Sequence, residues 1–183
     1  MMKKTLLLIA LCLPMVANAN WFVGGDFATG EQGGTLLPSL NAKGLHRSHT
    51  FRINVGKTMD DHWQRYGYVQ RHSTQSKKDQ TLKGWQVGGG MRYQYPLATN
   101  WALVTHVDAG LYRSHYSYSD KELSLDETTI GLVAGTQLGV TYSVSERFSL
   151  NTGWRYQRRF GLDLDGNSFK NDSTLYMGAS YSF

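Results

Sequence analysis

The last ten residues of the 183-residue chain alternate strictly between two kinds of side chain. Apolar residues take every second position and small or polar residues take the positions between, setting Leu175, Met177, Ala179, Tyr181 and Phe183 against Thr174, Tyr176, Gly178, Ser180 and Ser182. A two-residue period predicts a β-strand with one apolar and one polar face. At the end of a soluble protein such a strand would be an exposed sheet edge, whereas a closed barrel has no edge. The stretch therefore favours a barrel over a soluble sandwich.

The front of the chain carries the pattern of an export signal. Two lysines precede an apolar run over residues 5–16, and Ala17-Asn18-Ala19 supplies a small-x-small cleavage site. This arrangement predicts a secretory signal peptide over residues 1–19, cleaved after Ala19, and a mature domain over residues 20–183. The single cysteine, Cys12, leaves with the signal, so the mature domain has no thiol for disulfides, metal binding or redox chemistry.

The mature domain carries only a mild positive charge. Without the two lysines of the leader, 17 of the 19 Lys and Arg remain against 14 Asp and Glu. This balance is too small to predict a nucleic-acid partner. No later stretch approaches the roughly 18 consecutive apolar residues of a transmembrane helix. A membrane-spanning form must then be a closed barrel, because every backbone N–H and C=O group in hydrocarbon needs a partner.

Eight segments alternate between apolar and polar positions, and we expect a strand in each: residues 20–30, 47–57, 62–72, 81–95, 101–116, 128–144, 147–160 and 174–183. Long connections, at 31–46, 73–80, 117–127 and 161–172, alternate with short ones. Outer-membrane barrels have short periplasmic turns and longer surface loops. The sequence therefore predicts a single all-β domain, an eight-stranded antiparallel transmembrane β-barrel with an up-and-down meander.

The distribution of charge separates this fold from a soluble barrel, which would place its large apolar face inside. Arg52, Arg92 and Arg155 are in phase with glycines, so the charged face must be the crowded inner one. Residues 62–72 are the least regular segment. There we expect Tyr66 and Tyr68 outside, Arg65 and Gly67 inside, and a bulge or a register change that accommodates Trp63 and Val69. We expect Pro96 in a tight turn outside the strand ladder.

The pattern Tyr176-x-Gly178-x-x-Tyr181-x-Phe183 resembles the C-terminal signal by which the assembly machinery recognises bacterial outer-membrane barrels. The whole mature chain resembles the small eight-stranded proteins related to the OmpA transmembrane domain, OmpX and the opacity-type adhesins. The resemblance implies a location in the outer membrane of a Gram-negative bacterium. It leaves the function open, because those families include structural anchors, adhesins and serum-resistance factors.

Polar residues on the inner face predict a network inside the barrel, formed by Asp26, Arg52, Arg65, Arg92, His106, Asp108, Gln137 and Arg155. An eight-stranded barrel is just wide enough to be filled by side chains. Charges removed from bulk water need partners, so we expect Asp–Arg pairs with Asp26 and Asp108 as the anions. Such a network plugs and rigidifies the barrel; the alternative is a narrow, gated path for small solutes.

Basic residues collect at the outer ends of the expected strands: Arg71, Lys77, Lys78, Lys83, Arg113, Arg158 and Arg159. Lipopolysaccharide presents phosphates at that height, and Lys and Arg suit phosphate oxygens through charge-assisted hydrogen bonds. The sequence is equally compatible with an ordinary solvated loop surface.

A catalytic alternative is a lipid A-modifying acyl hydrolase. His115 and Ser117 lie two apart on one face of an expected strand, and Glu127 follows in the next. A histidine that takes the serine proton and an acid that orients the histidine are what acyl hydrolysis requires. The segment resembles the lipid A deacylase motif only loosely, because it lacks the following Asn and lies two strands earlier. A metal site at His46, His49 and His72 lacks ligand spacing.

Together these patterns predict a monomeric or weakly associating outer-membrane barrel without cofactor, metal or catalysis. We expect it to display its loops at the cell surface as an adhesin or envelope-integrity protein. The expected partners are outer-membrane lipids and lipopolysaccharide, the barrel assembly machinery, and host-surface or phage ligands.

Overall fold

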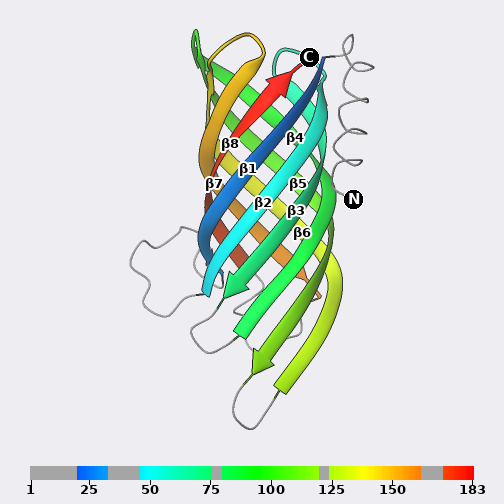
Figure 1. Cartoon of the computed structure of the whole chain (residues 1–183). Helices are drawn as coiled ribbons and strands as arrows, with labels where there is room; N and C mark the ends of the chain where they lie inside the picture. The colour runs from blue at the N-terminus through cyan, green and yellow to red at the C-terminus, as the bar shows by residue number, and fades with distance from the viewer. Residues whose placement is uncertain (1–19, 33–45, 76–79, 120–123, 162–170) are drawn as a thin grey trace, which may run out of the picture.

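A computed structural model describes residues 20–32, 46–75, 80–119, 124–161 and 171–183. Eight strands fill these ranges: β1 (Trp21–Gln32), β2 (His46–Thr58), β3 (Trp63–Gln75), β4 (Gln80–Ala98), β5 (Trp101–Ser119), β6 (Ser124–Ser143), β7 (Phe148–Phe160) and β8 (Asn171–Ser182). Each strand pairs antiparallel with its neighbour in sequence, and β1 pairs with β8 (Figure 1). The predicted eight-stranded closed meander is confirmed. Within the described ranges no helix is long and apolar enough to cross a membrane.

The two faces of the barrel wall are inverted relative to a soluble protein. Outward positions hold large apolar side chains such as Phe51, Val107 and Met177, the last of which is 72% exposed. Inward positions hold charged and amide side chains, and the largest fully buried ones are arginines, Arg52 among them at 1% exposure. Apolar surface of this extent is stable only against hydrocarbon. The structure is therefore that of a transmembrane barrel.

Inward glycines make room for the filled interior. A Cβ atom on Gly88 would overlap the carbonyl oxygen of Ala109 and lie 2.9 Å from the ring of Tyr68. At Gly84 the same atom would overlap the carbonyl oxygen of Arg113. Both positions exclude any side chain, because the wall and the contents of this narrow barrel meet there.

Three neighbouring strands are longer than the others, and the longest of them, β6, projects past β7 at one end of the barrel. β4, β5 and β6 have 19, 19 and 20 residues, against 12 or 13 in the remaining strands. The pairing of β6 with β7 begins at Leu132 and Phe160, so β6 runs beyond β7 from Gly131 to Ser124. Figure 1 shows this extension at the end of the barrel opposite the C-terminus.

The prediction of which side chains of β3 face inward and which face outward is wrong. Tyr66 and Tyr68 point inward and are buried, whereas Arg65, Gly67 and Val69 point outward and are exposed. No bulge interrupts β3, whose register with β2 and β4 is continuous. Large side chains occur on both of its faces, so the neighbouring strands decide its phase.

Two expected strand ends also differ from the structure. Pro96 was expected outside the ladder, but it lies within β4 opposite Ala102, and the register shifts between Pro96 and Ala98. A proline has no N–H to donate, and this irregularity accommodates it at the strand end. β8 begins at Asn171 rather than at Thr174, which brings Asp172 into the barrel wall.

Candidate functional site

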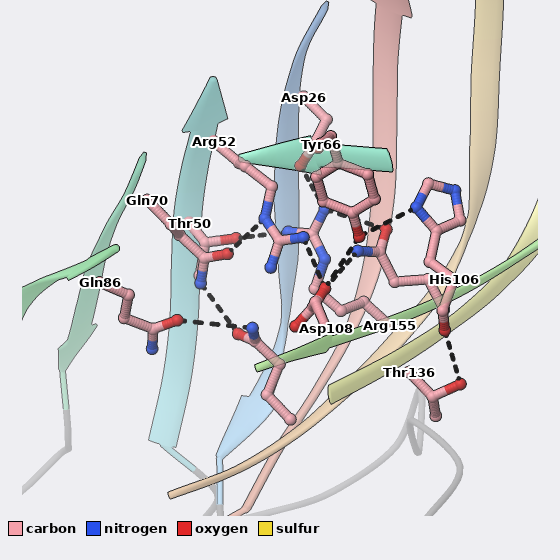
Figure 2. Close-up of polar contacts among 12 residues, drawn as sticks. Asp26, Thr50, Arg52, Tyr66, Gln70, Gln86, His106, Asp108, Thr136 and Arg155 are labelled. Atoms are coloured by element: carbon pink, nitrogen blue, oxygen red, sulfur yellow. Dashed lines mark hydrogen bonds and ion pairs between the residues drawn. The ribbon is translucent and has the colours of Figure 1, made fainter. Parts of the chain in front are cut away.

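The centre of the barrel interior is organised around the carboxylate of Asp108 on β5. Its Oδ2 accepts hydrogen bonds from Nη1 of Arg52 at 2.8 Å, Nε2 of Gln137 at 3.1 Å and the hydroxyl of Tyr66 at 3.3 Å. The guanidinium of Arg52 also lies over the ring of Tyr68, 4.1 Å from its centroid. Strands β2, β3, β5 and β6 thus meet at one anion, as Figure 2 shows. This converts a costly buried charge into a crosslink across the barrel.

A second ion pair joins the strands at the other side of the interior. Nη2 of Arg155 on β7 donates to Oδ1 of Asp26 on β1 at 2.6 Å. The same nitrogen lies 3.4 Å from Oε1 of Gln137, which links this pair to Asp108 (Figure 2). Side chains from β1, β2, β3, β5, β6 and β7 therefore belong to one connected network.

Three glutamines extend the network toward the long connections. Nε of Arg52 donates to Gln70 at 2.8 Å, Gln70 donates to Gln157 at 2.9 Å, and Gln157 donates to Gln86 at 3.4 Å. All three glutamines are fully buried. The sequence predicted that Gln86 and Gln157 face the interior. It did not predict this for Gln70, because the inner and outer faces of β3 were interchanged.

Arg159 does not belong to the outer basic rim where it was expected. It is buried, and its Nη2 lies 3.5 Å from Oδ2 of Asp172, which also accepts a hydrogen bond from the hydroxyl of Ser48 at 3.3 Å. The expectation placed Arg159 at the outer end of the strand over residues 147–160 and Asp172 in the loop that follows. The barrel wall continues further, because β8 begins at Asn171, and Asp172 then faces inward as a third buried anion.

The remaining predicted interior residues fall into two groups. Arg92 is buried and donates to Thr141 at 2.7 Å; no carboxylate pairs with it among the residues that the structure describes. Nδ1 of His106 lies 3.3 Å from the hydroxyl of Tyr66, at the margin of the central network. Arg65 is not in the interior: it points to the outside of the barrel. The expectation failed there because it rested on the inverted phase of β3.

Little space remains inside the barrel. A cavity beside Asp26, Arg52 and Tyr66 has a volume of about 20 Å³. A larger space of about 160 Å³ lies at the end with the short connections, between Arg92 and Arg147. A single water needs roughly 10–15 Å³ by this kind of measure, so the inner cavity has room for about one.

Four of the predicted rim residues, Arg71, Lys83, Arg113 and Arg158, point outward and are exposed. Arg71 and Arg113 are the cross-strand neighbours of Trp85, and Lys83 is the neighbour of His115. Arg71, Lys83 and Arg113, but not Arg158, line an open hollow of about 390 Å³ on the outer wall. Lys77 and Lys78 lie outside the described residues.

Sequence and structure comparisons identify the family of the chain. Residues 5–183 match the family described as "Outer membrane protein beta-barrel domain". The chain belongs to this family. A Haemophilus influenzae protein described as uncharacterized is 31% identical, over 86% of this chain and 90% of its own length. The protein is accordingly an integral β-barrel of a Gram-negative outer membrane.

Solved structures show the same fold at low sequence identity. Neisserial surface protein A superimposes with a TM-score of 0.64 at 18% identity, covering 90% of this chain and 98% of its own. The attachment invasion locus protein of Yersinia pestis gives a TM-score of 0.54 at 16% identity, covering 90% of this chain and 99% of its own. The barrel domain of Pseudomonas aeruginosa OprF gives 0.54 at 13% identity, covering 90% and 98%. In such barrels the short turns face the periplasm, which orients the present one.

The geometry of this outer-membrane barrel contradicts a Ser117–His115–Glu127 relay. The pleat of β5 places His115 and Ser117 on one face and Tyr116 on the other. Glu127 is the cross-strand partner of Tyr116, whereas Thr128 is the partner of His115. Residues directly opposite on paired strands share a face, so Glu127 lies on the other face from His115. Nδ1 of His115 instead lies 3.3 Å from the hydroxyl of Thr128.

The residues of the expected assembly signal lie on both faces of β8. Tyr176 and Gly178 point inward, and the guanidinium of Arg155 lies 5.2 Å from the centroid of the Tyr176 ring. Tyr181 and Phe183 form an edge-to-face ring pair at 5.2 Å, and the backbone N–H of Phe183 donates to the carbonyl oxygen of Trp21 at 2.9 Å.

The described residues include no group of three metal-ligating side chains.

Proposed function

We propose that the protein is a rigid surface-display element of the outer membrane, of the adhesin or envelope-integrity type, that neither catalyses a reaction nor transports solutes. The filled interior is the observation that carries this proposal. Three Arg–Asp pairs are buried inside the barrel, and the cavity beside Asp26 and Arg52 measures about 20 Å³. A barrel filled in this way offers its chemistry to partners only from the outside.

The extension of β5 and β6 supports display. These two strands carry their pairing beyond the end of β7, in register as far as Ser119 and Ser124. Backbone hydrogen bonds between β5 and β6 hold these strand ends, here called the β5–β6 tip, in place. The paired ends of β5 and β6 are therefore held at a fixed distance from the membrane, where host-surface or phage ligands would meet them.

Lipopolysaccharide is the proposed partner of the outer wall. Arg71, Lys83 and Arg113 surround Trp85 on a surface that begins one row above the apolar residues Val87 and Leu111. Charged side chains facing lipid cost about 2–4 kcal/mol at the midplane and about 0–1 near an interface, so this cluster belongs at the outer interface. Its charge suits lipid phosphates.

Export and assembly complete the proposal. The leader over residues 1–19 and its cleavage after Ala19, the recognition of the C-terminal pattern by the assembly machinery, and the monomeric state are proposed from sequence alone.

A comparison of cells making the full chain with cells making a shortened β5–β6 tip tests the display function. In this variant an Asn-Gly turn replaces residues 119–124, which removes only the last residue of β5 and the first residue of β6 with the connection between them, so every pairing of β5 with β4 is kept. We expect it to reach the outer membrane and to lose adherence to host cells or resistance to detergent. Unchanged adherence and detergent resistance in a correctly inserted variant would contradict the proposal.

A further inference from the structure

Two cations face each other on the outer wall of the barrel near its periplasmic end. Lys57, next to the last residue of β2, is the direct cross-strand partner of Arg65 on β3, and both side chains point away from the interior. Like charges at directly opposed positions destabilise a sheet. Neither cation forms an ion pair with a carboxylate in the part of the chain that the structure describes. Within the described part of the chain, no anion balances these two charges.

The two cations border a hollow in the wall. Trp21, Val55, Lys57, Arg65 and Gly67 line a space of about 220 Å³. Trp21 is the cross-strand neighbour of Lys57, at the level of the aromatic residues that mark the membrane interface. Val55 is the neighbour of Gly67, one row nearer the membrane centre. The hollow therefore has a cationic, aromatic mouth at the interface and an apolar floor that leads into the hydrocarbon.

Gly67 is the residue that makes the hollow, and the barrel itself does not require a glycine there. A Cβ on Gly67 would meet nothing closer than the carbonyl oxygen of Gly88 at 3.7 Å, which is ordinary contact. On the inner face the corresponding atom at Gly88 would overlap backbone. Next to Gly67 in register lies Gly89, which also points outward, so the floor continues smoothly onto β4.

We propose that this hollow binds one anionic phospholipid of the periplasmic leaflet. Its phosphate lies between the ammonium of Lys57 and the guanidinium of Arg65, and one acyl chain follows the floor over Gly67. Charge complementarity selects this occupant over a second copy of the chain. The lipid-facing walls of β3 and β4 offer no carboxylate among the described side chains, whereas they do carry further cations, Arg71 and Lys83.

Native mass spectrometry of the folded, mature barrel tests the proposal, with phosphatidylglycerol and phosphatidylcholine added as probes. We expect the wild type to retain one phosphatidylglycerol in preference to phosphatidylcholine. Each basic side chain near a lipid surface favours an anionic lipid enough that removing it lowers affinity about fivefold. In the Lys57→Gln/Arg65→Gln variant the affinity for phosphatidylglycerol should fall about fivefold for each of the two charges removed. In the Gly67→Leu variant both charges remain, and the added side chain should weaken binding by filling the hollow.

The Arg47→Gln/Arg147→Gln variant is the matched control, since it removes the same charge from two exposed positions that line neither outer hollow. It should bind phosphatidylglycerol as the wild type does. Folding of every variant is checked by heat-modifiable mobility on a gel, and the charge variant decides alone if Gly67→Leu does not fold. Equal binding by Lys57→Gln/Arg65→Gln and wild type, an equal loss in the control, or no preference over phosphatidylcholine would each overturn the proposal.

Discussion

Arg155 and Arg158 are three residues apart on β7 and lie on opposite sides of the barrel wall. Arg155 is buried against Asp26, with exposed side-chain fractions of 1% and 7%, whereas Arg158 is exposed on the outside. The same side chain therefore serves as an internal crosslink in one place and as a surface charge in the other. Burial and pairing, rather than residue type, decide what each contributes to stability.

Replacement of Arg155 by Met should destabilise the barrel strongly. The change leaves the carboxylate of Asp26 buried without its cation, and breaking a buried pair from one side costs about 3–5 kcal/mol. Arg158→Met should change the free energy of unfolding little, because an exposed cation contributes at most about 1 kcal/mol. Urea unfolding of both variants in lipid vesicles measures the difference. Similar unfolding midpoints would show that the interior pair does not hold the barrel together.

The β2–β3 turn contains an acid that the backbone stabilises as a carboxylate. The N–H groups of His62 and Trp63 each donate to Oδ1 of Asp60 at 2.8 Å, and these bonds hold its pKa below the ordinary 3.8. A carboxyl group with a lowered pKa in the folded state contributes stability above its unfolded value. That contribution disappears as the pH falls through the folded value.

Asp60→Asn should therefore reduce the loss of stability on acidification below about pH 4, the window set by the ordinary carboxyl pKa. Unfolding midpoints of the wild type and the variant, measured above and below that pH, provide the test. Asp61→Asn is the control, because the neighbouring Asp61 accepts no hydrogen bond within the described residues. A wild-type pH profile in the Asp60 variant would show that the turn does not use this carboxylate.

Glycines on the two faces of the wall should respond differently to the same added methyl group. Gly88→Ala places a methyl against the carbonyl oxygen of Ala109 and the Tyr68 ring, and overpacking of this kind costs about 1–3 kcal/mol. Gly67→Ala meets nothing closer than 3.7 Å and should be tolerated. Folding yields into vesicles distinguish the two variants. Equal yields would mean that the interior relaxes more easily than its packing indicates.

The sequence predicted the strands and most of the interior because alternation is a local property. On β2 and β5 only one face is apolar, so Arg52 and Asp108 could be placed inside from sequence, and they do form an ion pair. β3 carries large side chains on both faces, and its phase depends on register with β2 and β4. Arg65 was consequently misplaced and Gln70 was missed.

The predicted positions of Arg159 and Asp172 were wrong for another reason. Their partnership depends on how far the wall continues past the expected strand ends, and this is set by the neighbouring strands. Sequence periodicity near a loop does not contain that information. The hollow at Lys57 and Arg65 was missed for the same kind of reason, since it joins two strands whose relative phase was inverted.

At the scale of the molecule, the leader can be tested directly. Cleavage after Ala19 should give a mature protein beginning at Asn20, whose carbonyl oxygen accepts a hydrogen bond from Thr58 at 2.8 Å. N-terminal sequencing of the protein from purified outer membranes measures this. An intact Met1 in membrane-inserted protein would contradict the prediction.

The filled interior should also prevent ion flow. We expect no steady conductance from the wild-type barrel in planar bilayers, because guanidinium and carboxylate groups occupy its cross-section. Arg52→Ser combined with Arg155→Ser removes both cations that cross the centre and should produce measurable currents. The outward pair Lys83→Ser with Arg113→Ser serves as control. Steady wild-type currents would favour the narrow solute channel instead.

The bond between Arg155 and Asp26 joins residues 129 positions apart in the chain. It forms only after the first strand has met the end of the polypeptide, so it belongs to the last step of folding. Contacts of this kind are absent from an early transition state, and they act mainly by slowing unfolding. The buried network would thus determine how long an inserted barrel persists rather than how fast it forms.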